Sequence, residues 1–139
     1  VSDCTFLGAD GEITPKPSSE HVAVFEGFFN LLSYASLFPS HERHDVIVLN
    51  SVSNLRRCTD FFRAHRCASL WLDNDGAGRA AAARLLEESD AMTIIDRSPR
   101  YHGNNDLNDF LVQRMGVVKG QQTRQTEAHN NDNHLSSTL

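Results

Sequence analysis

Four apolar segments, each followed by a stretch with helical spacing, divide residues 21–111 of the chain. The segments are His21–Phe25, Asp45–Leu49, Ala68–Leu72 and Met92–Ile95. The second is β-branched and almost wholly apolar, as a strand covered on both faces of a sheet should be. We therefore expect four strands at the centre of the fold.

The stretches after these segments have the spacing of amphipathic helices. The residues expected to face the core are Phe28, Leu31, Leu32 and Ala35; Leu55, Cys58 and Phe62; Gly78, Ala81, Ala82 and Leu85; and Leu107, Phe110 and Leu111. The short alternation of strand and helix predicts an α/β fold. Its strands should be mainly parallel, with right-handed crossovers and helices on both faces.

The two ends of the chain differ in composition from this alternating part. Residues 1–19 contain two prolines and one short apolar run at residues 4–7, and we interpret them as an N-terminal extension or linker. Residues 20–115 hold the predicted domain. Residues 116–139 are polar and rich in Gln and Asn, which predicts a disordered tail that buries little surface.

Composition narrows the class of protein. The net charge of −5 argues against a generic nucleic-acid coat, which would need a basic face. The 3 cysteines form no Cys-x-x-Cys pair, so we expect neither a disulfide framework nor a zinc site, and a cytoplasmic location is the simplest. We expect no membrane association, because no apolar run is long enough to span a bilayer. Because the chain begins with Val1 rather than methionine, we expect a fragment or a processed product.

The segment Ala68–Leu72 leads into two aspartates, Asp73 and Asp75, and then into an alanine-rich helical pattern. Ligands of open α/β sheets bind beyond the carboxyl ends of the strands, and alternate residues of an extended segment point the same way. Two close carboxylates repel unless a proton or cation lies between them, and their hard oxygens suit Mg²⁺. A simple exposed turn remains the alternative, because Asp, Asn and Gly all favour turns.

Glu26 closes the first apolar segment in a similar way and is followed by Gly27. Its structural alternative is to stabilise the start of the next helix, an effect of about 0.3–1 kcal/mol. Together with Asp73 and Asp75 it predicts three carboxylates at one edge of the sheet. Such a set is suited to one or two Mg²⁺ ions acting on a phosphodiester.

Three stretches of the sequence resemble the Toprim domain: Val24–Phe28, Leu72–Ala80 and Tyr101–Leu111. They are most similar to the primase branch, especially the primase-like proteins of plasmids and conjugative elements. The resemblance implies a single Rossmann-like domain with a four-stranded, mainly parallel sheet. It also implies an enzyme that performs Mg²⁺-dependent nucleotidyl transfer during primer synthesis in DNA replication.

The resemblance implies roles for single residues. Glu26 would be the general acid or base and would bind Mg²⁺ together with Asp73 and Asp75, with Mn²⁺ as a substitute ion. Asp106 and Asp109 would add a second acidic shell.

Two positions depart from the primase pattern. Asn30 stands where primases often have Asp, and Asn105 replaces a lysine before the last motif. Both changes weaken the charge pattern and make polymerase activity less secure, but they leave Glu26, Asp73 and Asp75 in place.

The implied partners are single-stranded DNA and nucleoside triphosphates, together with a zinc-binding or helicase module in the parent protein. Arg56, Arg57 and Arg79 are candidate nucleic-acid contacts, with a solvated helix face as the alternative reading of the first two. We expect Trp71 to pack in the core rather than to stack on a base.

Other functions stay open. A Toprim nuclease would cut phosphodiesters without consuming triphosphates, and a non-catalytic Toprim module would bind nucleic acid or a partner without turnover. A phosphatase of the Asp-x-Asp type is disfavoured, because there the acidic pair follows the first strand, whereas here it follows the third predicted strand.

Overall fold

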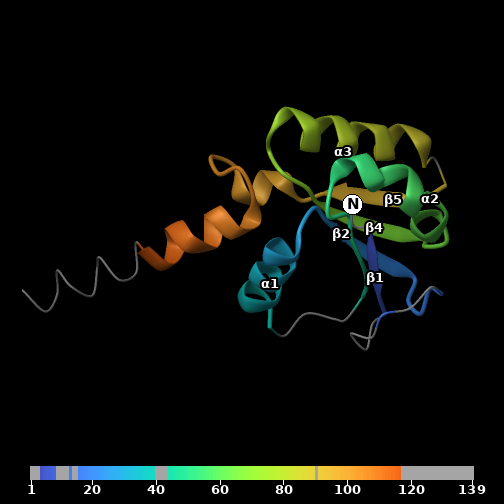
Figure 1. The fold of residues 1–139 in the computed structure, drawn as a ribbon, viewed down its shortest axis with the longest axis horizontal. Helices are drawn as coiled ribbons and strands as arrows, with labels where there is room; N and C mark the ends of the chain where they lie inside the picture. The colour runs from blue at the N-terminus through green and yellow to red at the C-terminus, as the bar shows by residue number, and fades with distance from the viewer. Residues whose placement is uncertain (1–3, 9–12, 14–15, 40–43, 90, 117–139) are drawn as a thin grey trace, which may run out of the picture.

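Parallel strand pairing organises the fold (Figure 1), in a computed structural model that describes residues 4–8, 13, 16–39, 44–89 and 91–116. The parallel strands are β2 (His21–Phe25), β3 (Asp45–Val48), β4 (Cys67–Trp71) and β5 (Thr93–Asp96). The short strand β1 (Thr5–Leu7) pairs antiparallel with β3, so the order across the sheet is β1-β3-β2-β4-β5. The sheet thus contains the four predicted strands and a fifth, which comes from the segment interpreted as an extension.

Helices cover both faces of this sheet, which confirms the predicted α/β class. The helices are α1 (Phe28–Leu37), α2 (Leu55–Arg63) and α3 (Gly76–Glu88), with two short 3₁₀ helices, η1 (Val52–Asn54) and η2 (Ser98–Tyr101). Residues 107–116 are also helical. In Figure 1, α2 and α3 lie on one side of the sheet and α1 lies on the other.

The alternation of side chains along the strands builds two cores. Val22, Val24 and Leu70 belong to the first core, together with the buried faces of α2 and α3. Ala23, Phe25 and Trp71 belong to the second, where they pack with Tyr101 and Leu107. Trp71 is therefore a packed residue, as the sequence predicted. The predicted inward residues of α2 and α3 are all buried.

The inward face of α1 differs from the one that its apolar spacing predicts. Phe28 and Leu32 are 45% and 60% exposed, whereas Asn30 and Ser33 are buried. Ser33 donates a hydrogen bond to the side chain of Asn108, and the side-chain oxygen of Asn30 accepts one from the backbone of the same residue. Leu31, Tyr34 and Leu37 of the same helix pack against the second core. The polar pairings allow Asn30 and Ser33 to be buried beside them, because a buried polar group without a partner is costly.

At the amino end of the strands, Asp45 is fully buried. Its carboxylate accepts hydrogen bonds from the hydroxyl and backbone N–H of Ser18, from the backbone N–H of Ser19 and from Nε2 of His65 at 2.7 Å. Burial acts to raise the pKa of Asp45, but the hydrogen bonds from Ser18, His65 and Ser19 outweigh it and hold the pKa below its usual value. The network ties the segment before β2 and the end of α2 to the start of β3.

None of the helices in the described part of the chain is long and apolar enough to cross a membrane. The predicted disordered tail lies almost wholly outside the described residues, which end at Gly116.

We predict that Asp45→Asn lowers the free energy of unfolding by roughly 2–4 kcal/mol, because an amide cannot accept all of these hydrogen bonds. Since the folded state holds the pKa of Asp45 low, this stabilisation is present above about pH 4 and is lost as the pH falls further. Urea unfolding at several pH values measures both effects. Asp60→Asn, an exposed change on α2, is the control. Equal losses in the two variants would contradict the prediction.

Candidate functional site

Two acidic residues leave neighbouring strands at the same edge of the sheet. Glu26 directly follows β2, and Asp73 comes two residues after the end of β4. The strands are parallel and adjacent, with Phe25 opposite Trp71 in the register. The carboxyl ends of the strands, where α/β proteins bind ligands, therefore bring these two side chains together.

Glu26 and Asp73 are in direct contact. The backbone N–H of Asp73 donates to Oε1 of Glu26 at 3.2 Å, and the two carboxyl groups influence each other's ionisation. Burial, the hydrogen bond with Asp73 and the charges of Asp73 and Asp75 raise the pKa of Glu26 to about 7. Burial also raises the pKa of Asp73, with further contributions from the charges of Asp106 and Asp75. Glu26 is therefore a proton-carrying group poised near neutral pH.

Helix α3 comes very close to this pair. A Cβ atom at Gly78 would lie 2.2 Å from the carbonyl oxygen of Asp73 and 2.8 Å from Oε1 of Glu26. The equivalent atom at Gly76, two residues earlier, would meet nothing within 4 Å. Only a glycine at position 78 lets the helix start against the two acidic residues.

Asp75 is placed differently from the other two predicted ligands. It is the N-cap of α3, and its Oδ1 accepts a hydrogen bond from the backbone N–H of Gly78 at 2.7 Å. The side chain is exposed and acts on Glu26 and Asp73 through its charge. The structure thus brings two of the three predicted carboxylates together and puts the third at the helix start beside them.

Asn74 connects the loop after β5 to the turn that carries Asp73 and Asp75, which we call the acidic turn. Its backbone N–H donates to the carbonyl oxygen of Asn105 at 2.6 Å, and its side chain donates to the carbonyl oxygens of Asn104 and Tyr101. Tyr101 in turn donates its hydroxyl to the carbonyl oxygen of Leu72 at 2.5 Å. The sequence assigned no role to Asn74, although it stands between the two aspartates of the motif.

This loop carries the two residues of the predicted second acidic shell. The charge of Asp106 acts on Asp73 and raises its pKa, and Oδ1 of Asp106 accepts from the backbone N–H of Asp109. Asp109 is exposed, and within the described residues no hydrogen bond or ion pair joins its side chain to Glu26 or Asp73.

Asn30, one of the departures from the primase pattern, is part of the site. Its side-chain N–H donates to Oδ1 of Asp73 at 3.4 Å, while its own oxygen accepts from the backbone of Asn108. An aspartate at this position would place a third carboxylate against Asp73. The hydrogen bond from the neutral amide instead opposes the rise in the pKa of Asp73 that burial causes.

A family profile described as Toprim-like matches residues 23–111, the range that contains all of these residues. The chain belongs to the Toprim-like family. No curated protein and no solved structure matched it. The match confirms the predicted resemblance to the Toprim domain. This domain is a metal-binding fold that is found in enzymes acting on nucleic acids.

The three candidate arginines of this Toprim-like domain occupy different surroundings. Arg79 donates to Asp96 at 2.6 Å and to the carbonyl oxygens of Leu72 and Asp73, so it joins the acidic turn to the end of β5. Arg56 and Arg57 are exposed near the start of α2, which follows the carboxyl end of β3.

The carboxylate oxygens of Glu26 and Asp73 are the possible metal ligands at the centre of the Toprim-like site. In the part of the chain that the structure describes, no group of three or more His, Cys, Asp or Glu side chains is arranged to hold a metal ion. Mg²⁺ commonly uses only one or two protein carboxylates and completes its shell with water and substrate phosphates. The contact between Glu26 and Asp73 fits that pattern, because a cation would relieve the same repulsion that a shared proton relieves.

We predict that Gly78→Ala lowers the free energy of unfolding by roughly 1–3 kcal/mol, because α3 must move away from Asp73 to admit the methyl group. The matched control is Gly76→Ala, where the added methyl group meets open space and should cost nothing. Urea unfolding of the two variants checks the prediction, and equal stabilities would contradict it.

We further predict that metal-free protein loses stability between about pH 4.5 and pH 7 because of Glu26. The folded state holds the pKa of Glu26 at about 7, above its value in the unfolded chain, so the folded state binds the extra proton in this range. Its contribution is complete below the unfolded pKa and is lost as the pH rises through 7.

The measurement is the thermal midpoint against pH in the presence of a chelator. Glu26→Gln should flatten the decline, whereas the exposed variant Glu87→Gln on α3 should follow the parent. A Glu26→Gln profile parallel to that of the parent would show that this carboxyl group has an ordinary pKa.

Proposed function

We propose that this Toprim-like domain is the Mg²⁺-dependent nucleotidyl-transfer domain of a primase-like protein, which synthesises primers for bacterial or mobile-element DNA. The observation that carries the proposal is the contact between Glu26 and Asp73 at the carboxyl edge of β2 and β4. Membership of the Toprim-like family supports it, because Toprim domains bind metal ions and process nucleic acids.

Glu26 is suited to general acid–base work. An acid–base group is most effective when its pKa lies near the working pH, and the pKa of Glu26 is about 7. In nucleotidyl transfer, Glu26 would accept the proton of the attacking hydroxyl group. Asp73 keeps Glu26 in position through the hydrogen bond from its backbone N–H.

Asp73 and Glu26 would hold Mg²⁺, or Mn²⁺ in its place, with Asp75 and Asp106 adding negative charge around the ion. The bound ion would supply charge stabilisation for the phosphates of the incoming triphosphate. Asp109 stays a candidate of the outer acidic shell, reached through its contact with Asp106.

The substrates in this proposal are nucleoside triphosphates and single-stranded DNA, in the cytoplasm, with a zinc-binding or helicase module as partner. Arg56 and Arg57 are the stronger candidates for phosphate contacts, because their side chains are exposed. Arg79 would reach a phosphate only by giving up its ion pair with Asp96.

A non-catalytic role has one observation in its favour. The carboxylate of Asp75 is engaged with the backbone of α3 and not with Glu26 or Asp73. A binding module could keep this cap and the acidic pair without performing chemistry.

We predict that Asp73→Asn leaves the metal-free thermal midpoint unchanged or raises it, because the change removes charge repulsion. The same variant should lose the stabilisation that millimolar Mg²⁺ gives the parent, since a ligand stabilises only the state that binds it. Glu26→Gln should keep more of the Mg²⁺ response but lose all phosphoryl transfer. Asp60→Asn, on the surface of α2, is the control for a changed net charge.

Product analysis with nucleoside triphosphates and single-stranded DNA separates the functions. New primer strands support the proposal, strand cleavage without triphosphates indicates a nuclease, and a Mg²⁺ response without turnover indicates a binding module. If the parent shows no Mg²⁺ response and Asp73→Asn unfolds the metal-free protein, Asp73 has only a structural role and the proposal fails.

A further inference from the structure

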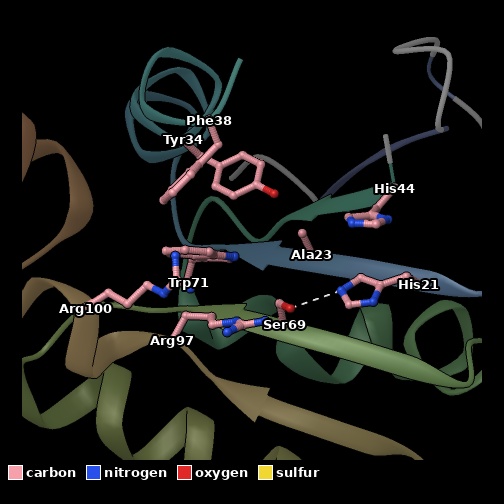
Figure 2. A pocket seen from close by; sticks show the side chains of 9 residues that line it. All are labelled: His21, Ala23, Tyr34, Phe38, His44, Ser69, Trp71, Arg97 and Arg100. Carbon is pink, nitrogen blue, oxygen red and sulfur yellow. Dashed lines mark hydrogen bonds between the residues drawn. The ribbon is translucent and has the colours of Figure 1, made fainter. Parts of the chain in front are cut away.

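A cavity of about 210 Å³ lies on the α1 side of the sheet, and neither Glu26 nor Asp73 lines it. Figure 2 shows that its walls come from β2, β4, α1 and the segment after β5. A second cavity of about 420 Å³ shares Phe38, Trp71 and Arg100 with the first. The second cavity by itself falls within the range of small-molecule sites, about 300–1,000 Å³, and the first, which adjoins it at these shared residues, is smaller.

Two buried hydrogen-bond donors at the first cavity find no acceptor in the part of the chain that the structure describes. Nε1 of Trp71 and Nε of Arg97 are buried without a hydrogen-bond partner among the described residues. Trp71 is only 4% exposed, and Figure 2 shows its indole nitrogen toward the middle of the cavity. An unsatisfied buried donor costs about 1–3 kcal/mol, and a ligand with acceptor atoms would remove that cost.

The charge around both cavities has one sign. Arg97 and Arg100 line the first and Arg100 and Arg114 line the second, whereas none of the described residues lining either is acidic. Within the described residues neither Arg97 nor Arg100 forms an ion pair, although the chain has a net charge of −5. Their charges act on the hydroxyl of Tyr34 and oppose the rise in its pKa that burial causes. The ligand that complements this surface is an anion.

Aromatic rings form another part of the wall of the first cavity, and it is completed by His21, Ala23, His44 and Ser69. The ring of Trp71 lies 5.0 Å from that of Tyr34 and 5.8 Å from that of Phe38, measured between centroids. The guanidinium of Arg100 lies over the ring of Phe38 at 5.6 Å. Flat ligand groups stack on such rings and on guanidinium planes. The cavity therefore favours a ligand that combines a flat ring with an anionic oxygen cluster.

We propose that this cavity is a nucleotide-binding site, in which Trp71 Nε1 and the Arg97 guanidinium hold the phosphate and the aromatic wall holds the base. The site is separate from Glu26 and Asp73, and it would exist whether or not the domain synthesises primers. The nucleotide could be free in solution or stand at the 5′ end of a single strand, because both present the same phosphate and base.

The test uses the fluorescence of Trp71, the single tryptophan in the sequence. Uridine monophosphate is titrated into the full chain with a chelator present, and excitation at the red edge of tryptophan absorption avoids the nucleotide. We expect a saturable change in emission. Arg97→Gln should weaken binding about tenfold or more, as the loss of a charge-assisted hydrogen bond does.

The matched control is Arg84→Gln, because Arg84 is an exposed arginine on α3, where it pairs with Glu88. It should leave the affinity unchanged. Trp71→Phe keeps an aromatic ring but removes the N–H, and calorimetry should show weaker binding, with circular dichroism checking that the variant folds. Inorganic phosphate and uridine, tested alone, should each bind more weakly than the monophosphate.

Two oligonucleotides distinguish the sources of the ligand. Binding of a 5′-phosphorylated strand, but not of its unphosphorylated copy, indicates a strand end, and binding of the free nucleotide alone indicates a small molecule. Three results would overturn the proposal. They are the absence of any saturable signal, equal losses in Arg97→Gln and Arg84→Gln, and binding of inorganic phosphate as tightly as the monophosphate.

Discussion

The contact between Glu26 and Asp73 constrains everything else at the carboxyl edge of the sheet. Parallel pairing of β2 with β4 holds these two carboxyl groups together, although they repel when both are ionised. The neighbouring residues accommodate this repulsion between the two carboxyl groups. Gly78 leaves room for both groups, and Asn30 offers Asp73 an amide donor where an acid would add a third charge. The fold thus stores an electrostatic cost that a proton or a cation can relieve.

Much of this arrangement follows from local sequence patterns. The apolar runs locate the four parallel strands, and the 3.6-residue spacing locates the buried faces of α2 and α3. Glu26 and Asp73 could be expected at one edge because the carboxyl ends of parallel strands share an edge. That they touch depends on β2 lying directly beside β4, and strand order is set by long-range pairing that the local pattern does not contain.

The differences arise where a polar partner decides the conformation. The apolar spacing of α1 favours Phe28 and Leu32 as inward residues, yet the helix turns Asn30 and Ser33 inward because both find partners there. Strand alternation would point Asp75 in the same direction as Asp73. The chain has already left the strand, however, and Asp75 closes the first turn of α3 instead. Neither outcome can be obtained by counting apolar positions.

The end of β4 connects the acidic pair to the aromatic side of the sheet. Trp71 packs in the second core, Leu72 packs in the first, and Asp73 reaches Glu26. Tyr101 contacts two of these three residues, since it stacks on Trp71 and donates its hydroxyl to the carbonyl oxygen of Leu72. The loop that follows Tyr101 is thereby fixed without regular secondary structure, and it brings Asp106 close enough for its charge to act on Asp73. Tyr101 therefore links the packing of Trp71 to the position of the acidic pair, so the aromatic core and the site are joined by direct contacts.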